Sequence, residues 1–374
     1  MTPAYPSTEC SVSRLFCLLE QTGIRYAVLR NYELLPALRY GPGSALGTDI
    51  DLVIHTDDLP VWRIVADRLA QEHGWDAVTE CDHWRQSKVR AHNIEVFRFY
   101  RASPPAFLQV DVFHGYLVWG FPLFDECELL KGRIFNATRQ LTHIDAFREN
   151  TFRLLQINGL LGSGRSQDKI SRYRKKVLQF CAGDGAHFRL SLRAYFSVFG
   201  ERALSALEAS DFAGFARNMR RAKAYFAARF VFRRRSEAIR CFIARFKDHG
   251  QRYFRRQCGS PIRTYAPDDR CKNRLRAALN ELVALNVIDR WTDRGAGRRT
   301  LDWHEHRVLE QGGLAVKWAD RRSAQFNATL YKDERQVAAG LIRFLIARHP
   351  RVEIRASQHR IPIDEAAVVN GTAE

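Results

Sequence analysis

The stretch GTDIDLVI, residues 47 to 54, constrains the fold more than any other part of this 374-residue chain. Its alternation predicts a β-strand whose apolar side chains face a core, while Asp49 and Asp51 project together from the opposite face. Two neighbouring anions repel each other unless a cation lies between them. The stretch therefore predicts a divalent metal site or, in the simpler alternative, a half-exposed strand that carries both aspartates into water.

A second stretch, FLQVDVFHG at residues 107 to 115, alternates in the same way and places Asp111 on a polar face. If the two strands are neighbours, three carboxylates meet at one edge of the sheet. Oxygen ligands of this kind suit Mg²⁺ or Mn²⁺ held jointly with substrate phosphates. Such ions activate an attacking hydroxyl and stabilise a leaving pyrophosphate.

The surrounding residues predict a small α/β domain with a mixed sheet over residues 1–140. Apolar spacing indicates two helices, and Asn31 is placed to cap a third, short one. The predicted helices cover 11–21 and 57–72, and the predicted strands cover 25–30, 49–54, 75–80, 93–100 and 107–119.

Charge divides the chain into unlike parts. Residues 1–140 hold 14 Lys and Arg against 17 Asp and Glu, whereas the remainder holds 45 against 24. Helical spacing runs from about Asp145 to Arg256, which predicts a basic helical region over 141–257. After the break at CGSP, mixed α/β character returns and defines a smaller C-terminal region over 258–374.

The segment 213–257 is the most basic part, with 14 basic and 2 acidic residues. Three interpretations stay open. The segment binds anionic lipid through an interfacial helix, it binds nucleic-acid phosphate, or it is a bundle whose aromatic stripe is core and whose charges are solvated. In the lipid case, the rings of Phe226 and Phe230 insert into the membrane.

Cysteine spacing and hydropathy argue against some classes of structural site and against a membrane-spanning protein. The eight cysteines form no C-x-x-C pair, so neither a disulfide framework nor a zinc ribbon is expected. No apolar run reaches the roughly 18 residues of a membrane span, and the first residues carry no basic-then-apolar signal. We expect a cytoplasmic protein, with peripheral contact at the inner membrane face if the basic segment binds lipid.

At these residues the chain resembles the polymerase-β-like nucleotidyltransferase superfamily, whose signature is a Gly-Ser turn, an Asp-x-Asp strand and a third acid on a neighbouring strand. The lead-in YAVLRNYELLP followed by GTDIDLVI is similar to uncharacterised nucleotidyltransferase families of bacterial polysaccharide gene clusters. The resemblance covers about residues 10–180. It implies that Asp49, Asp51 and Asp111 bind the metal and carry catalysis.

The resemblance also implies a triphosphate site, and there the chain departs from the family. The superfamily places its Gly-Ser at a helix start, about ten residues before the first aspartate; here the corresponding strand ends in Leu29-Arg30-Asn31, with neither glycine nor serine. A helix N-terminus still attracts phosphate. The predicted nucleotide-binding residues are therefore Arg30, Asn31, Gly47, Thr48 and Lys169.

Three further motifs are weaker indications of a phosphate or zinc site. GLLGSGRS at 159–166 has phosphate-loop spacing, but helical spacing precedes it, so a helix–helix connection is expected. APDDRCKN at 266–273 resembles the phosphate loop of a thymidylate-kinase-like domain that has lost its glycines and serine. This resemblance implies an inactive, degenerate P-loop region; the alternative is an unrelated α/β cap. DWHEH at 302–306 has too few ligands for a zinc site.

Together these features predict metal-dependent transfer of a nucleotidyl group from a nucleoside triphosphate to an unidentified hydroxyl or phosphate acceptor, in surface-polysaccharide synthesis by the resemblance. Two alternatives remain. The fold acts without catalysis as a binding or scaffold subunit, or it modifies RNA as a toxin-like nucleotidyltransferase of net charge +18.

Overall fold

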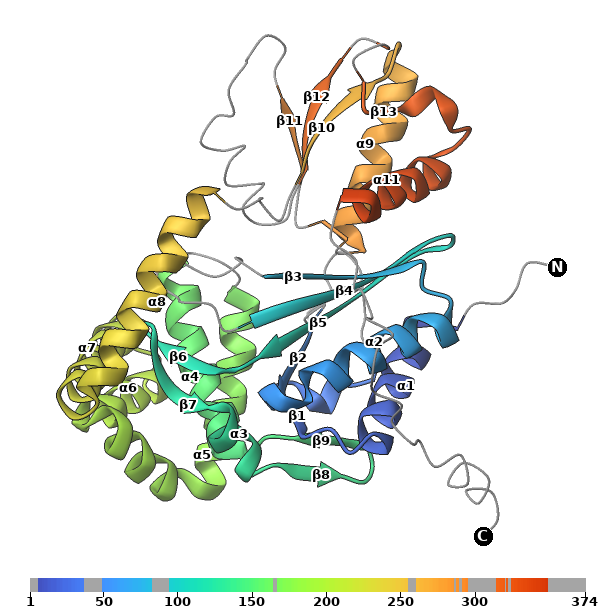
Figure 1. Ribbon diagram of the computed structural model, residues 1–374. Helices are drawn as coiled ribbons and strands as arrows, with labels where there is room; N and C mark the ends of the chain where they lie inside the picture. Colours follow the sequence, from blue (N-terminus) through green and yellow to red (C-terminus); the bar gives the residue numbers. More distant parts are fainter. Residues whose placement is uncertain are drawn as a thin grey trace, which may run out of the picture.

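The computed structural model in Figure 1 shows a mixed α/β protein. It describes residues 6–36, 49–82, 94–163, 167–254, 260–285, 287–288, 291–294, 314–319, 321 and 324–348.

Within these residues, the N-terminal part forms a seven-stranded mixed sheet of order β3-β4-β5-β2-β1-β9-β8. The central strands β2 and β5 are parallel, whereas β1 runs antiparallel to β2. The strands are β1 (Tyr26–Val28), β2 (Asp49–Ile54), β3 (Ala77–Asp82), β4 (Ile94–Ala102), β5 (Pro105–Phe113), β8 (Ile134–Asn136) and β9 (Leu141–His143).

Two helices, α1 (Thr8–Gln21) and α2 (Leu59–His73), cover one face of this sheet (Figure 1). Helix α1 begins at Ser7, whose hydroxyl accepts a hydrogen bond from the Cys10 amide, and α2 ends at Gly74 with φ 64°. Both helices were predicted from apolar spacing, and both are confirmed, with no boundary shifted by more than three residues. Their core includes Val12, Leu15, Leu19, Ile50, Leu52, Trp62, Val65 and Leu69.

Two local predictions need correction. The single strand expected over 107–119 is broken at Gly115, where φ is 124°, and the chain continues as a separate hairpin. Asn31 lies at the N-cap position, but at φ 58° its side chain makes no capping hydrogen bond. The elements concerned are η1 (Tyr32–Leu34), η2 (Thr56–Asp58), β6 (Gly115–Val118), β7 (Phe121–Asp125) and α3 (Glu126–Lys131).

A helical region packs on the other side of the molecule and reaches the opposite sheet face. Its core joins Ala27, Leu29 and Val53 of the sheet to Phe152 and Leu155. The face of β2 that carries the aspartates is therefore turned toward these helices. They are α4 (Ala146–Ser163), α5 (Gln167–Phe196), α6 (Val198–Glu208), α7 (Phe212–Arg233) and α8 (Arg235–Phe254).

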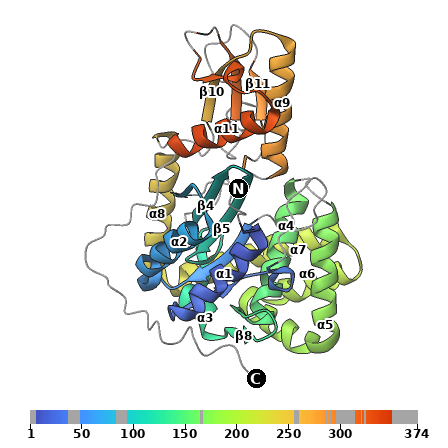
Figure 2. The ribbon, with the colours of Figure 1, turned by 90° about the vertical axis from the view of Figure 1, so that its right-hand side faces the viewer.

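The C-terminal part is a parallel sheet of order β11-β12-β10-β13 with two helices. Its core includes Tyr100 and Phe107 from the end of the β4–β5 hairpin, so it packs on the N-terminal sheet (Figure 2). Its elements are β10 (Ser260–Tyr265), α9 (Asp269–Ala284), β11 (Trp291–Arg294), β12 (Leu314–Trp318), β13 (Phe326–Asn327), η3 (Ala328–Leu330) and α11 (Glu334–Arg348).

Among the residues that the structure describes, none of the helices is both long enough and apolar enough to cross a bilayer.

Candidate active site

The three predicted acidic residues come together. Strands β2 and β5 pair in parallel, with Asp51 directly opposite Asp111. Asp49 lies two residues before Asp51 on β2 and therefore on the same face of the sheet. One carboxylate oxygen from each residue lies within 4.8 Å of the other two. Asp51 and Asp111 are buried, and Asp49 is half-buried. The convergence predicted from the two alternating stretches is thus confirmed.

Burial makes this cluster electrostatically costly. It raises the pKa of Asp51; the charge of Arg30 opposes that rise, and the charge of Asp49 adds to it. Burial and the charge of Asp49 both disfavour the ionised form of Asp51. A nearby cation is therefore needed if the carboxylates are to stay ionised side by side.

The cation that the structure shows at Asp51 is Arg30, which follows β1. Its Nη2 donates to Asp51 Oδ1 at 2.9 Å, and its Nε donates to Oδ2. The two side chains are 10% and 4% exposed, so this is a buried, two-pronged ion pair. The sequence predicted that Arg30 binds phosphate, whereas here it binds a predicted metal ligand. Each carboxylate oxygen has a second lone pair, so the Arg30 bonds leave acceptor capacity for a metal ion.

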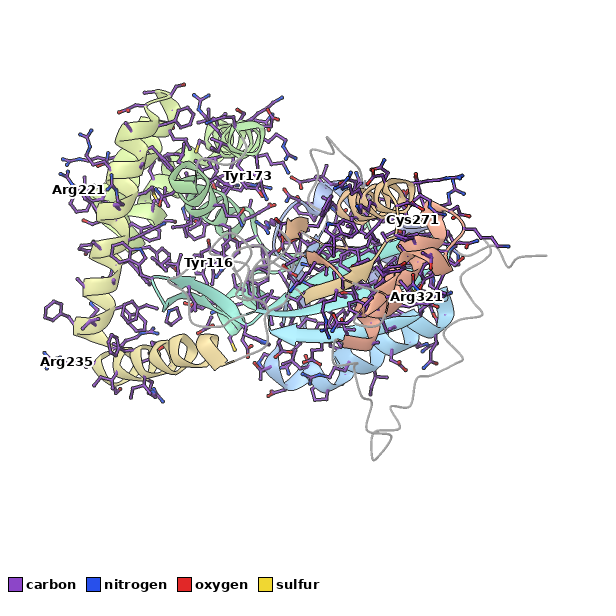
Figure 3. All side chains as sticks on the ribbon, turned by 90° about the horizontal axis from the view of Figure 1, so that it is seen from above. Tyr116, Tyr173, Arg221, Arg235, Cys271 and Arg321 are labelled. Carbon is purple, nitrogen blue, oxygen red and sulfur yellow. The ribbon has the colours of Figure 1, made fainter. Side chains whose placement is uncertain are left out.

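Helix α5 places Lys169 and Tyr173 beside this pair, since the charge of Tyr173 acts on Arg30 and that of Lys169 acts on Asp51. Figure 3 labels Tyr173. Burial alone would raise the pKa of Tyr173, but the charges of Arg30 and Lys169 outweigh it and lower that pKa. Lys169 Nζ lies 5.7 Å from the Tyr173 ring centroid, and its charge also reaches Asp51. The predicted nucleotide-binding Lys169 is therefore near the acidic residues.

The predicted role of Asn31 does not fit the structure. Its backbone amide donates to Glu149 Oε1 at 3.1 Å, so a carboxylate already occupies the position expected for phosphate. Lys176 Nζ contacts Glu33 Oε1 at 2.7 Å and Asn31 Oδ1 at 3.4 Å, and Arg153 pairs with Glu149. These contacts hold the loop after β1 against α4 and α5, which indicates a structural role.

Gly47 and Thr48 lie outside the described residues, and so does DWHEH at 302–306. The predicted roles of Gly47 and Thr48 stay predictions.

Sequence reasoning missed one neighbour of the acidic cluster. Gln109 is buried and donates through Nε2 to Asp111 Oδ1 at 2.8 Å. Its position two residues before Asp111 on an alternating strand was the signal that could have found it. Arg174, which follows Tyr173 on α5, donates instead to the Leu207 and Glu208 carbonyls on α6.

Neither phosphate-loop motif forms such a loop in the described residues. Residues 159–163 belong to helix α4, as expected for a helix–helix connection. At the second motif, β10 leads into α9, but Asp268 caps the helix and accepts a hydrogen bond from the Cys271 amide at 2.7 Å. The helix N-terminus is thus satisfied by the chain's own carboxylate, and no glycine allows close approach of a phosphate.

Comparison of the chain with protein-family models, with curated proteins and with solved structures found no match.

Proposed function

We propose that this protein is a metal-dependent nucleotidyltransferase, which moves a nucleotidyl group from a nucleoside triphosphate to a hydroxyl or phosphate acceptor. The observation that carries the proposal is the convergence of Asp49, Asp51 and Asp111 within 4.8 Å on neighbouring strands. The cationic side chains of Arg30 and Lys169 lie beside them. The resemblance in the Asp-x-Asp strand selects nucleotidyl transfer among metal-dependent reactions.

The donor set fits a divalent ion that prefers oxygen. Octahedral Mg²⁺ has bonds of about 2.1 Å, which separates adjacent ligand oxygens by about 3 Å and opposite ones by about 4 Å. One carboxylate oxygen from each of Asp49, Asp51 and Asp111 lies within 4.8 Å of the other two, so small side-chain adjustments bring them to this spacing. Mg²⁺ or Mn²⁺ bound here activates the attacking hydroxyl and stabilises the leaving pyrophosphate.

The remaining side chains have distinct roles in this proposal. Arg30 orients the Asp51 carboxylate through two hydrogen bonds, and Lys169 stabilises phosphate charge next to it. Asp111 accepts a hydrogen bond from the neutral Gln109 amide, whereas Asp51 binds a guanidinium. By the resemblance, we assign Asp111 to the acceptor side, where it takes the proton of the attacking hydroxyl.

Transfer of a labelled group tests this function. The purified protein is incubated with each α-³²P-labelled nucleoside triphosphate, Mg²⁺ and a cell extract. We expect one acceptor to become labelled with the wild type, and no labelling with Asp51→Asn. Asp67→Asn, on helix α2, is the matched control and should leave the labelling unchanged. Equal labelling by the wild type and Asp51→Asn would refute the assignment.

A non-catalytic binding protein is the second candidate. The specific observation in its favour is that the buried Arg30 already neutralises Asp51, so the fold has a cation of its own at this position. Calorimetry separates the two candidates. Mg²⁺-dependent binding of a nucleoside triphosphate that is lost in Asp49→Asn supports the enzyme, whereas metal-independent binding supports a scaffold.

The basic segment suggests a partner, which we propose is an anionic lipid surface. Phe226 and Phe230 are core residues, 8% and 7% exposed, so the expectation that they insert into lipid is wrong. Other apolar side chains at the end of α7 and on α8 are exposed and lie among exposed arginines. Figure 3 shows Arg221 and Arg235 on the outer side of these helices. The exposed apolar residues are Val231, Phe232, Ile239, Phe242 and Ile243.

Vesicle sedimentation tests this partner. Phe242→Ser should weaken binding to anionic vesicles, and binding should fall steeply with salt. Leu190→Ser, an equally exposed apolar position on α5, is the control and should bind as the wild type does. RNA binding that requires Arg233, Arg234 and Arg235, with no vesicle binding, would instead support the RNA-modifying alternative.

A further inference from the structure

A second group of potential ligands lies at the other end of strand β2. His55 directly follows the strand, and Glu126 and Cys127 are the first two residues of helix α3. The side chain of Asp125 accepts a hydrogen bond from the Glu128 amide and fixes where α3 begins. The chain thus brings residues about 70 positions apart to one place.

The donor atoms of these three residues have the spacing of a tetrahedral metal site. His55 Nε2 lies 3.7 Å from Cys127 Sγ and 3.9 Å from Glu126 Oε1, and the three atoms lie within 4.8 Å of one another. Zinc bonds of about 2.0–2.3 Å at tetrahedral angles separate the donors by about 3.3–3.6 Å. Side-chain adjustments of less than about 1 Å therefore bring all three donors to one ion.

Neighbouring groups orient two of these ligands. The Asp57 backbone amide donates to His55 Nδ1 at 3.3 Å, and the Asp57 carboxylate lies 3.3 Å from the same nitrogen. A metal ion takes the Nε2 lone pair in the tautomer that carries its proton on Nδ1, and in that tautomer the Asp57 carboxylate accepts the Nδ1 proton. The Thr56 hydroxyl donates to Glu126 Oε2 at 2.6 Å, which leaves Oε1 turned toward His55. A carboxylate behind a ligating histidine is the usual outer shell of a zinc site.

The charges of His55, Glu126 and Cys127 favour a metal site over a catalytic thiolate. A Cys–His contact alone is also the geometry of a catalytic thiolate. Here the Glu126 carboxylate lies beside the Cys127 thiol and would repel a thiolate, whereas a divalent ion neutralises both anions. The His55 and Glu126 side chains are each 17% exposed, and Cys127 is exposed, so solvent can enter and supply further ligands.

We propose that His55, Glu126 and Cys127 bind a divalent transition metal, with Zn²⁺ as the best fit to one nitrogen, one oxygen and one sulfur donor. The ion joins the end of β2 to the start of α3. His55 is four residues beyond Asp51, about 13 Å along an extended strand. The site is therefore separate from the all-oxygen cluster, and a sulfur ligand gives it a different metal preference.

Cobalt spectroscopy on the full-length, metal-stripped protein tests the proposal. One equivalent of Co²⁺ should give the visible bands of a tetrahedral ion and a thiolate-to-cobalt band in the near ultraviolet, both abolished by added Zn²⁺. Cys127→Ser should lose the thiolate band. Asp57→Asn should weaken Zn²⁺ binding about 10-fold, and Glu126→Gln should weaken it further.

Matched variants make the result decisive. Cys10→Ser removes another exposed thiol and should keep the thiolate band, and Asp49→Asn should keep it too, since that residue belongs to the other site. Circular dichroism checks the folding of each variant, and Glu126→Gln retains the cysteine if Cys127→Ser does not fold. The proposal is overturned if the wild type shows no thiolate band or if folded Cys127→Ser retains it. Rapid alkylation of Cys127 that excess Zn²⁺ leaves unchanged also overturns it.

Discussion

The buried ion pair between Arg30 and Asp51 should make a large contribution to stability, which Arg30→Met would measure. The substitution keeps an unbranched side chain and removes the charge, so Asp51 remains 4% exposed beside two other carboxylates. Two unit charges about 4 Å apart at an effective dielectric constant near 20 interact by about 4 kcal/mol. Breaking one side of a buried pair costs about 3–5 kcal/mol in mutational studies. We therefore expect the free energy of unfolding at pH 7 to fall by about 4 kcal/mol.

The loss of stability in Arg30→Met should depend on pH, and the direction of that dependence can be derived. Burial already raises the pKa of Asp51, and removing the opposing charge of Arg30 raises it further. A carboxyl whose pKa is higher in the folded than in the unfolded protein binds protons more tightly when folded, so lowering the pH through that pKa stabilises the fold. The deficit of Arg30→Met should therefore be smaller at pH 5 than at pH 8.

Urea unfolding followed by circular dichroism measures both effects. Arg25→Met is the matched control: the Arg25 guanidinium pairs with Asp58 at a 41% exposed position, so its loss should destabilise the fold far less than the loss of Arg30. Adding Asp51→Asn to Arg30→Met should restore much of the loss, and Mg²⁺ should raise the Tm of Arg30→Met more than that of the wild type. A deficit no larger than that of Arg25→Met, with no response to Mg²⁺, would refute this reasoning.

Two further changes test the packing and the surface charges. Phe226→Ser should destabilise the helical region by about 3 kcal/mol or more in thermal unfolding, while Phe232→Ser, at a 73% exposed position, should cost under about 0.5 kcal/mol. The hydrogen bond from Arg14 lowers the pKa of Glu72 to about 2; partial burial opposes this shift, and the hydrogen bond from Arg68 adds to it. Because that pKa is lowered, its contribution is present above the unfolded value of about 4.5 and lost toward pH 2. Glu72→Gln should therefore flatten the acid limb of the stability profile, by under about 1 kcal/mol.

The acidic cluster could be predicted because it depends on local alternation. Asp49, Asp51 and Asp111 each occupy the polar side of a strand whose other side is apolar, and only the pairing of β2 with β5 had to be assumed. The helices α1 and α2 followed from apolar spacing for the same reason. Patterns of this kind are written in consecutive residues, so they can be read without knowledge of the tertiary structure.

Long-range contacts could not be predicted in this way. Arg30 faces a carboxylate 21 residues away, and the Asn31 amide is bonded to Glu149 from helix α4. Both pairings depend on how the helical region lies against the sheet. The burial of Phe226 likewise depends on its packing against Phe196 on α5, since an amphipathic helix shows an apolar face without showing what covers it.

The most direct test of the central claim is a titration of the metal-stripped protein with Mn²⁺, with and without a nucleoside triphosphate, followed by electron paramagnetic resonance. We predict that the wild type binds Mn²⁺ more tightly with the nucleotide present, and that Asp49→Asn and Asp111→Asn each weaken this binding by at least about 10-fold. Asp67→Asn should bind as the wild type does. Equal Mn²⁺ binding by the wild type and both variants would contradict the claim that these carboxylates form the metal site.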